Sequence, residues 1–247
     1  MKTAVTIISL FFIQTVAFAQ SQLACARTGL QSVNVYDSSK TRIIGTINKE
    51  TYFYYDTIIG NWFSVSSYGG FCNKNEVQVF AALTGKQQKQ KITAVIKKFL
   101  TICQQGNMPF TDSSKGIYDT VYIPKWQSYF DATFEPILNE FFGYYNTTKD
   151  TVTLLDFLKI GSCSPDGAFG MSFDYITGHC YDINKTLFAR QVRSIKNREQ
   201  RNQAKRTLLN SGITVYYNVK FQRQNKAAAE IAGLVNREQQ LAKKLLQ

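Results

Sequence analysis

The chain has 247 residues, enough for one large domain or two small ones, and its 44% hydrophobic and 14% aromatic residues are typical of a globular protein. The formal net charge is +12, and fourteen Lys and Arg against three Glu (net +11) fall within residues 185–247. A single histidine excludes zinc sites built from several His, and the sequence contains neither a Cys-x-x-Cys pair nor a glycine-rich phosphate loop, so we expect no metal and no cofactor.

The N-terminus has the pattern of a secretory signal peptide. Lys2 supplies a positive charge, an apolar run follows at 4–16, and Ala-Phe-Ala at 17–19 gives the small-x-small pattern that signal peptidase cleaves. The apolar run is shorter than the ~20 residues that span a bilayer. We therefore predict a signal peptide over residues 1–19 and an exported protein, periplasmic or extracellular. Lipid attachment at Cys25 is the alternative.

All five cysteines follow the signal segment and thus belong to a compartment in which disulfides persist. Cys25 and Cys72 bracket one candidate domain, and Cys163 and Cys180 bracket a stretch that contains Gly and Pro. We predict these two pairs as disulfides. Cys103 lies on the apolar face of an expected helix and is predicted to be a buried thiol.

Short strands separated by turn residues are expected in the first third of the chain. Turn formers such as Asp37-Ser38-Ser39 and Gly69-Gly70 punctuate this segment. Because only closure or sheet-on-sheet packing buries so many alternating faces, the pattern predicts a small barrel. The expected strands lie at 33–35, 43–47, 52–55, 62–65 and 77–80.

Four motifs follow one another in this segment: Val33-Asn34-Val35, Ile44-Gly45-Thr46-Ile47, Asn61-Trp62-Phe63-Ser64-Val65 and Gly70-Phe71. In this order and at this spacing they resemble the motifs of a bacterial SH3-like (SH3b) domain. The resemblance implies an SH3-like barrel over residues 20–80, followed by a linker at 81–86, and a role in binding cell-wall or protein ligands.

Aromatic residues of the expected barrel are the candidate ligand contacts, because their rings stack on sugars or peptides. The alternative is a place in the barrel core, an interpretation that the resemblance favours for Trp62. The candidates are Tyr36, Tyr54, Tyr55, Trp62 and Tyr68.

Beyond residue 86 the spacing of apolar residues along the sequence changes to that of helices. Apolar residues at helical spacing predict a helix over 87–104 and a second helical region over 126–141 that restarts near Pro136. A short apolar element is expected at 154–160. The stretch 161–178 is rich in turn formers.

The C-terminal quarter contains nearly all of the net positive charge of the chain. A long basic helix is expected over 184–210, ending at Ser211-Gly212, and a further helix begins near Lys226. Strict alternation of apolar and polar residues over 213–221 predicts a strand between them. Residues 87–247 thus form a mixed α+β domain of no recognised family, and the fold class is α+β: a small N-terminal SH3-like β-barrel, then this domain with its basic C-terminal helical region.

A basic patch on the long helix is a candidate contact for an anionic polymer or a membrane surface, although charge runs are commonly solvated helix faces. No specific nucleic acid is expected as a partner, and peripheral contact with a membrane stays open. The residues of the patch are Arg190, Arg193, Lys196, Arg198 and Arg201.

The sequence contains few residues in patterns that are typical of a catalytic site. SH3-like domains often accompany cell-wall cysteine hydrolases, and Cys163 with His179 is the one Cys-His pair that invites that alternative. No helix start behind Cys163 is expected to lower its pKa. The preferred function is therefore a non-catalytic, exported binding protein of the bacterial envelope, with a cell-wall polymer or an envelope protein as its partner and no catalytic residues.

Overall fold

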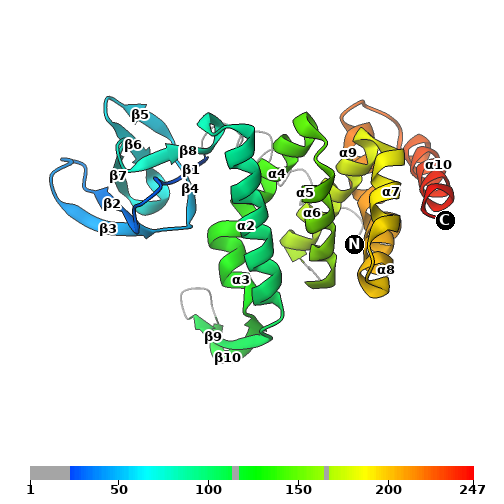
Figure 1. Cartoon of the computed structure of the whole chain (residues 1–247), viewed down its shortest axis with the longest axis horizontal. Coiled ribbons are helices and arrows are strands. Elements are labelled where there is room, and N and C mark those ends of the chain that lie inside the picture. Colours follow the sequence, from blue (N-terminus) through cyan, green and yellow to red (C-terminus); the bar gives the residue numbers. More distant parts are fainter. Residues whose placement is uncertain (1–22, 113–116, 164–166) are drawn as a thin grey trace. The chain divides into compact units, whose positions relative to one another are not determined.

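The computed structural model describes residues 23–112, 117–163 and 167–247 (Figure 1). The predicted signal peptide at 1–19 lies outside these ranges. The described chain divides into two compact units: unit 1 contains residues 23–95 and Trp126–Gly143, and unit 2 contains the described residues of 96–125 and 144–247. The predicted linker at 81–86 stays a prediction.

A five-stranded antiparallel sheet is the larger of two sheets in unit 1, with the order β3-β2-β7-β6-β5. Three of its strands were expected from the sequence, whereas β5 and β7 were not, because both are short and border Gly-rich turns. The strands are β2 (Ser32–Tyr36), β3 (Ile43–Asn48), β5 (Thr57–Ile59), β6 (Trp62–Val65) and β7 (Gly70–Asn73).

The second sheet has three antiparallel strands in the order β4-β1-β8: β1 (Leu23–Ala26), β4 (Tyr52–Tyr54) and β8 (Val77–Val79). Both sheets contribute to one apolar core. Its members include Ala24 and Phe53 from the smaller sheet. These sheets in the first part of the chain and the helices after them make the protein a mixed α+β structure.

Gly70 allows β7 to approach β2 closely. A Cβ at this position would lie 2.3 Å from the carbonyl oxygen of Tyr36 and 2.8 Å from Cγ1 of Val35. Contacts below about 3 Å require the neighbour to move, so any side chain here would push the two central strands apart. The Gly of the Gly70-Phe71 motif therefore has a packing role.

Helices of unit 1 follow the strands. The expected helix at 87–104 is confirmed as α2 (Gly85–Cys103), whose residues up to Val95 belong to this unit. Thr84 and Gln87 form a reciprocal capping box: the Gln87 carboxamide oxygen accepts from the Thr84 amide, and the Thr84 hydroxyl accepts from the Gln87 amide. The second helical region is also confirmed, as α3 (Trp126–Tyr129), a π-helical turn (Phe130–Phe134) and α4 (Glu135–Thr148).

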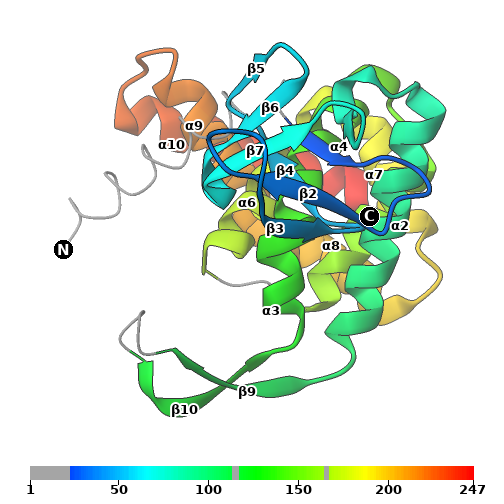
Figure 2. The ribbon, with the colours of Figure 1, turned by 90° about the vertical axis from the view of Figure 1, so that its left-hand side faces the viewer.

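Unit 2 is mainly helical. A two-stranded antiparallel hairpin of β9 (Asn107–Asp112) and β10 (Ile117–Pro124), visible in Figure 2, precedes its helices. The helices are α5 (Thr151–Leu158), a 3-10 turn (Lys159–Cys163), α6 (Gly167–Ile183), α7 (Lys185–Ser194), α8 (Arg198–Arg206), a π-helical turn (Thr207–Gly212), α9 (Ile213–Gln222) and α10 (Ala228–Leu246).

The strand predicted over 213–221 is wrong, because this segment is helix α9. α9 contacts α6, α10 and the π-helical turn before it. A helix with neighbours on several sides buries apolar residues around most of its circumference, so its sequence lacks a single apolar stripe. Ile213, Tyr216 and Tyr217 are all buried, at helical spacing, and the alternation along the sequence is incidental.

Two expectations for the neighbouring segments also need correction. Most of the turn-rich stretch at 161–178 belongs to α6, and the long basic helix breaks between α7 and α8. The backbone is extended at Ile195 and Asn197, and the Asn197 side chain caps the new helix α8 by accepting a hydrogen bond from the Gln200 amide at 3.0 Å. Gly178 is not a turn residue: a Cβ there would lie 2.2 Å from the carbonyl oxygen of Gly212.

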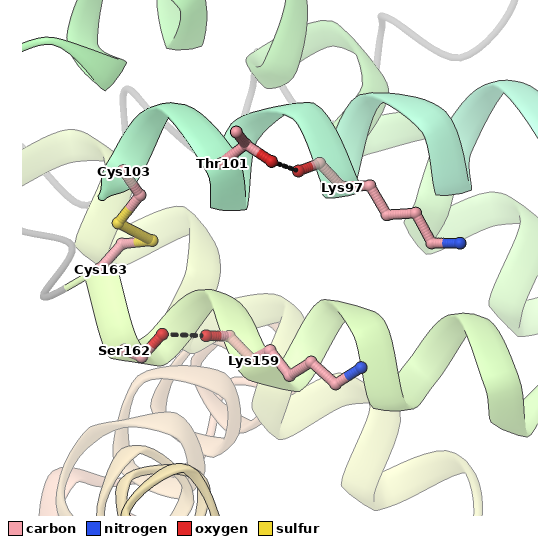
Figure 3. Close-up of a disulfide and its surroundings, with 6 residues drawn as sticks. All are labelled: Lys97, Thr101, Cys103, Lys159, Ser162 and Cys163. Carbon is pink, nitrogen blue, oxygen red and sulfur yellow. Dashed lines mark hydrogen bonds between the residues drawn. A yellow bond between two sulfur atoms is a disulfide. The ribbon is translucent and has the colours of Figure 1, made fainter. Parts of the chain in front are cut away.

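The predicted disulfides are wrong. Cys103, at the end of α2, is bonded to Cys163 with a Cα–Cα distance of 5.8 Å (Figure 3), while Cys25, Cys72 and Cys180 are free and buried. On β1, Ala24 and Ala26 face the core that contains Cys72, so strand alternation turns Cys25 to the opposite face. Burial raises the pKa of all three free thiols and makes them poor nucleophiles.

Candidate functional site

Strand alternation determines which aromatic rings of the five-stranded sheet face outward. Val33 and Val35 of β2 are buried in the core, so Tyr36 turns to the other face of the sheet. In β6 the core residue Phe63 directs its neighbour Trp62 outward in the same way. Tyr36 and Trp62 therefore lie on one face, although β7 separates their strands.

The two rings form an edge-to-face pair, with centroids 5.0 Å apart and an interplanar angle of 76°. Phe71 of β7 lies opposite Tyr36 in the strand register and shares this face. The edge strands add Ile43, in register with Tyr36, and Ile59, in register with Trp62. These isoleucines are 52% and 48% exposed. We call these five residues the aromatic face.

A cation borders the aromatic face. The Lys40 ammonium lies 4.8 Å from the centroid of the Phe71 ring, within the range of a cation–π interaction. The turn between β2 and β3 holds it there: an Asp37 carboxylate oxygen accepts from the Ser39 hydroxyl at 2.7 Å and from the Thr41 amide at 3.3 Å. The Ser39 hydrogen bond is the main reason that the pKa of Asp37 lies below its usual value.

Of the five predicted ligand contacts, only Tyr36 and Trp62 are thus brought together. Tyr55 is buried in the core with its ring 4.7 Å from that of Phe63. The Tyr54 hydroxyl accepts a hydrogen bond from the Asn139 carboxamide at 3.4 Å. Tyr68 is 40% exposed, with its ring against the core residue Phe53, so it belongs to a different part of the unit.

Sequence reasoning missed Phe71, the two edge isoleucines and Lys40. The signal for Phe71 was present: Gly70 and Cys72 are small residues that face the core, which leaves Phe71 on the outer face. No local pattern indicates Lys40, because its position depends on a turn in which it adopts a φ of 62°.

The Cys163–His179 pair does not form a catalytic site. The Cys163 sulfur is bonded to Cys103, so it cannot act as a thiolate nucleophile. His179 lies on α6 with its ring 5.3 Å from that of Tyr216, and burial lowers its pKa to about 4. The structure therefore removes the nucleophile on which the cysteine hydrolase alternative depends.

A polar cluster in unit 2 joins α6 to α9. The Asp182 carboxylate accepts hydrogen bonds from the Lys220 ammonium at 2.6 Å and from the hydroxyls of Tyr217 at 2.5 Å and Tyr216 at 3.0 Å. Burial opposes ionisation of Asp182, but these hydrogen bonds outweigh it and hold its pKa below the usual value. Three donors thus neutralise or hydrogen-bond the Asp182 carboxylate, so the cluster has a structural role in holding α6 against α9.

The predicted basic patch spans two helices and the link between them. Arg190 and Arg193 lie on α7, Lys196 lies in the link, and all three are exposed. On α8, Arg198 is exposed, and Arg201 is partly buried because its guanidinium donates to the Ile195 carbonyl at 3.0 Å. The patch therefore exists as a surface, although the single long helix expected to carry it does not.

None of the helices within 23–112, 117–163 and 167–247 combines the length and apolar character needed to cross a bilayer. Those same residues contain no group of three or more His, Cys, Asp or Glu arranged to hold a metal ion. Comparison with family models, curated proteins and solved structures found no match to the chain.

Proposed function

We propose that the protein is an exported, non-catalytic binding protein of the bacterial envelope. Residues 20–80 form an SH3-like barrel in this proposal, and its aromatic face binds a cell-wall polymer or an envelope protein. The observation that carries the proposal is the pair of Tyr36 and Trp62, held edge to face on the outer side of the five-stranded sheet. Export rests on the signal-peptide pattern at 1–19.

Two features support the SH3-like barrel. Two of the resembling motifs lie in strands of the five-stranded sheet: Val33-Asn34-Val35 in β2 and Trp62 with Val65 in β6. Two small antiparallel sheets also share a single core, which is the packing that a small barrel requires.

The chemistry of the aromatic face favours a ligand with both apolar surface and negative charge. Tyr36 and Trp62 are partly exposed. Tyr and Trp rings offer flat apolar surface at low entropic cost, which is why these residues dominate binding hot spots. The exposed Ile43 and Ile59 extend that surface across the sheet. The Lys40 ammonium at its margin adds a partner for a carboxylate. Wall peptides and glycans with carboxylate groups supply both properties.

The test is a pull-down of the mature chain with purified peptidoglycan, comparing wild type with Tyr36→Ala/Trp62→Ala. We expect retention to fall at least about tenfold, because each ring contributes an energy of the hot-spot range. Retention of wild type should persist at raised salt, since apolar stacking is not screened.

The matched control is Tyr122→Ala, which removes a tyrosine that is 72% exposed in the β9–β10 hairpin of unit 2. It should leave retention unchanged, and circular dichroism should show that both variants fold. Equal retention by the double variant and wild type would contradict the proposal. Cleavage of the wall polymer that disappears in His179→Ala would contradict its non-catalytic part.

A further inference from the structure

Unit 2 exposes a cationic surface that the binding role of the aromatic face does not use. It runs along α7, the link and α8, which follow one another in Figure 1. We call this set the basic surface: Arg190, Arg193, Lys196, Arg198, Arg201 and Arg206.

The positive charge of the basic surface is not neutralised by the protein itself. Two of the three acidic residues in 185–247 pair elsewhere, because Glu238 pairs with Lys185 at 2.7 Å and Glu230 pairs with Lys226. The third, Glu199, is exposed in the first turn of α8 and offsets one of the six positive charges of the basic surface. Within the described part of unit 2, no carboxylate lies within ion-pair distance of the basic surface. A cluster of unpaired cations this dense repels itself, so a polyanion that covers it lowers the free energy.

The adjoining end of α10 extends this surface. α10 packs beside α7, and the Arg193 guanidinium donates to the Leu245 carbonyl near the end of α10. Lys243 and Lys244 are exposed there, and Leu241 is exposed by 38%. An apolar side chain among cations is typical of protein surfaces that lie on a bilayer, where the apolar group enters between the headgroups.

We propose that the basic surface docks the protein on a bilayer containing anionic phospholipids. Five of its six cations are Arg. The planar guanidinium binds phosphate oxygens through two parallel hydrogen bonds, and it is more weakly hydrated than an ammonium group. No exposed aromatic residue lies in α7 or α8. The surface therefore has groups for lipid phosphates but none for stacking on nucleic-acid bases.

The experiment is cosedimentation of the full mature chain with two kinds of vesicle: phosphatidylcholine alone, and phosphatidylcholine mixed with phosphatidylglycerol. We expect binding to the mixed vesicles only, with loss at ~0.5 M NaCl, where the Debye length is only a few ångströms. The variant Arg190→Gln/Lys196→Gln/Arg198→Gln/Arg206→Gln should bind at least about tenfold more weakly. Arg193 and Arg201 are left intact because they donate to backbone carbonyls.

A matched variant removes four charges elsewhere: Lys49→Gln/Lys74→Gln/Lys86→Gln/Lys97→Gln, all of exposed residues outside the basic surface. It should bind the mixed vesicles like wild type. The variant Tyr36→Ala/Trp62→Ala should also bind them like wild type, which would show that vesicle binding does not depend on the aromatic face. Equal binding to both vesicles, or an equal loss in the matched variant, would overturn the proposal. The absence of binding to the mixed vesicles would overturn it as well, and capture of duplex DNA or wall polymer that the quadruple Gln variant loses would assign the basic surface to that polyanion instead.

Discussion

Gly178 lies where α6 passes closest to the segment that joins α8 to α9. A Cβ on it would lie 2.2 Å from the Gly212 carbonyl oxygen and 2.5 Å from Cβ of Tyr216, and neither atom belongs to a flexible side-chain end. We expect Gly178→Ala to lower the free energy of unfolding by about 1–3 kcal/mol through forced separation of the helices. Chemical denaturation monitored by circular dichroism measures the change.

Gly233 provides the matched control for that substitution. It is an exposed residue of α10, and a Cβ there meets no atom within 4 Å. Gly233→Ala should raise the free energy of unfolding by up to about 1 kcal/mol, the difference in helix propensity. If both substitutions change stability in the same direction, close packing at Gly178 is not what requires glycine there.

Glu140 on α4 makes the stability of the protein depend on pH. Burial raises its pKa to about 7, above the unfolded value near 4.5. Because the folded state holds this proton more tightly, the carboxyl stabilises the fold below pH ~4.5, and that contribution is lost as the pH rises to about 7.

Glu140→Gln should therefore raise the free energy of unfolding at pH 8 by about 1–3 kcal/mol and change it little at pH 4, because the neutral amide replaces the neutral acid. Urea denaturation of wild type and variant at the two pH values measures this difference. A gain of equal size at both pH values would instead indicate a packing effect.

At the scale of elements, the disulfide joins the end of α2 to the 3-10 turn after α5. It spans a sequence separation of 60 residues, for which the chain-entropy relation gives about 4 kcal/mol of stabilisation. Cys103→Ala/Cys163→Ala should lose about that amount in chemical denaturation. Reductant should destabilise wild type similarly and leave the double variant unaffected; a stabilised double variant would contradict this role.

The elements that the sequence predicts correctly are those whose signals are local. α2 and α10 each carry one apolar stripe, and the strands β2 and β6 each alternate between the core and the outer face. The prediction for α9 was wrong because neighbouring elements bury this helix on several sides. Tertiary packing, and not the local alternation of apolar and polar residues, determines its structure. The pairing of Cys103 with Cys163 is equally non-local, since no spacing in the sequence brings α2 and the 3-10 turn together.

Across the whole molecule, the sequence predicts that positive charge is concentrated in the C-terminal quarter. It does not predict which of these charges stay unpaired on the surface. The sequence shows that 185–247 is basic, whereas the structure shows which cations its few carboxylates leave unpaired. The aromatic face was also predicted only in part. Two of its five residues were expected as aromatic ligand contacts, and the other three follow only from sheet order and register.

The β9–β10 hairpin has a consequence for the dynamics of the chain. Its strands pair with each other, and no other described element of unit 2 packs against either of them to a comparable extent. An isolated two-stranded ribbon is marginally stable in water, whereas α6 packs on several neighbours. The backbone amides of β9 and β10 should therefore exchange with deuterium through local opening, long before those of α6, and a protease added to the native protein should nick the chain first at this ribbon.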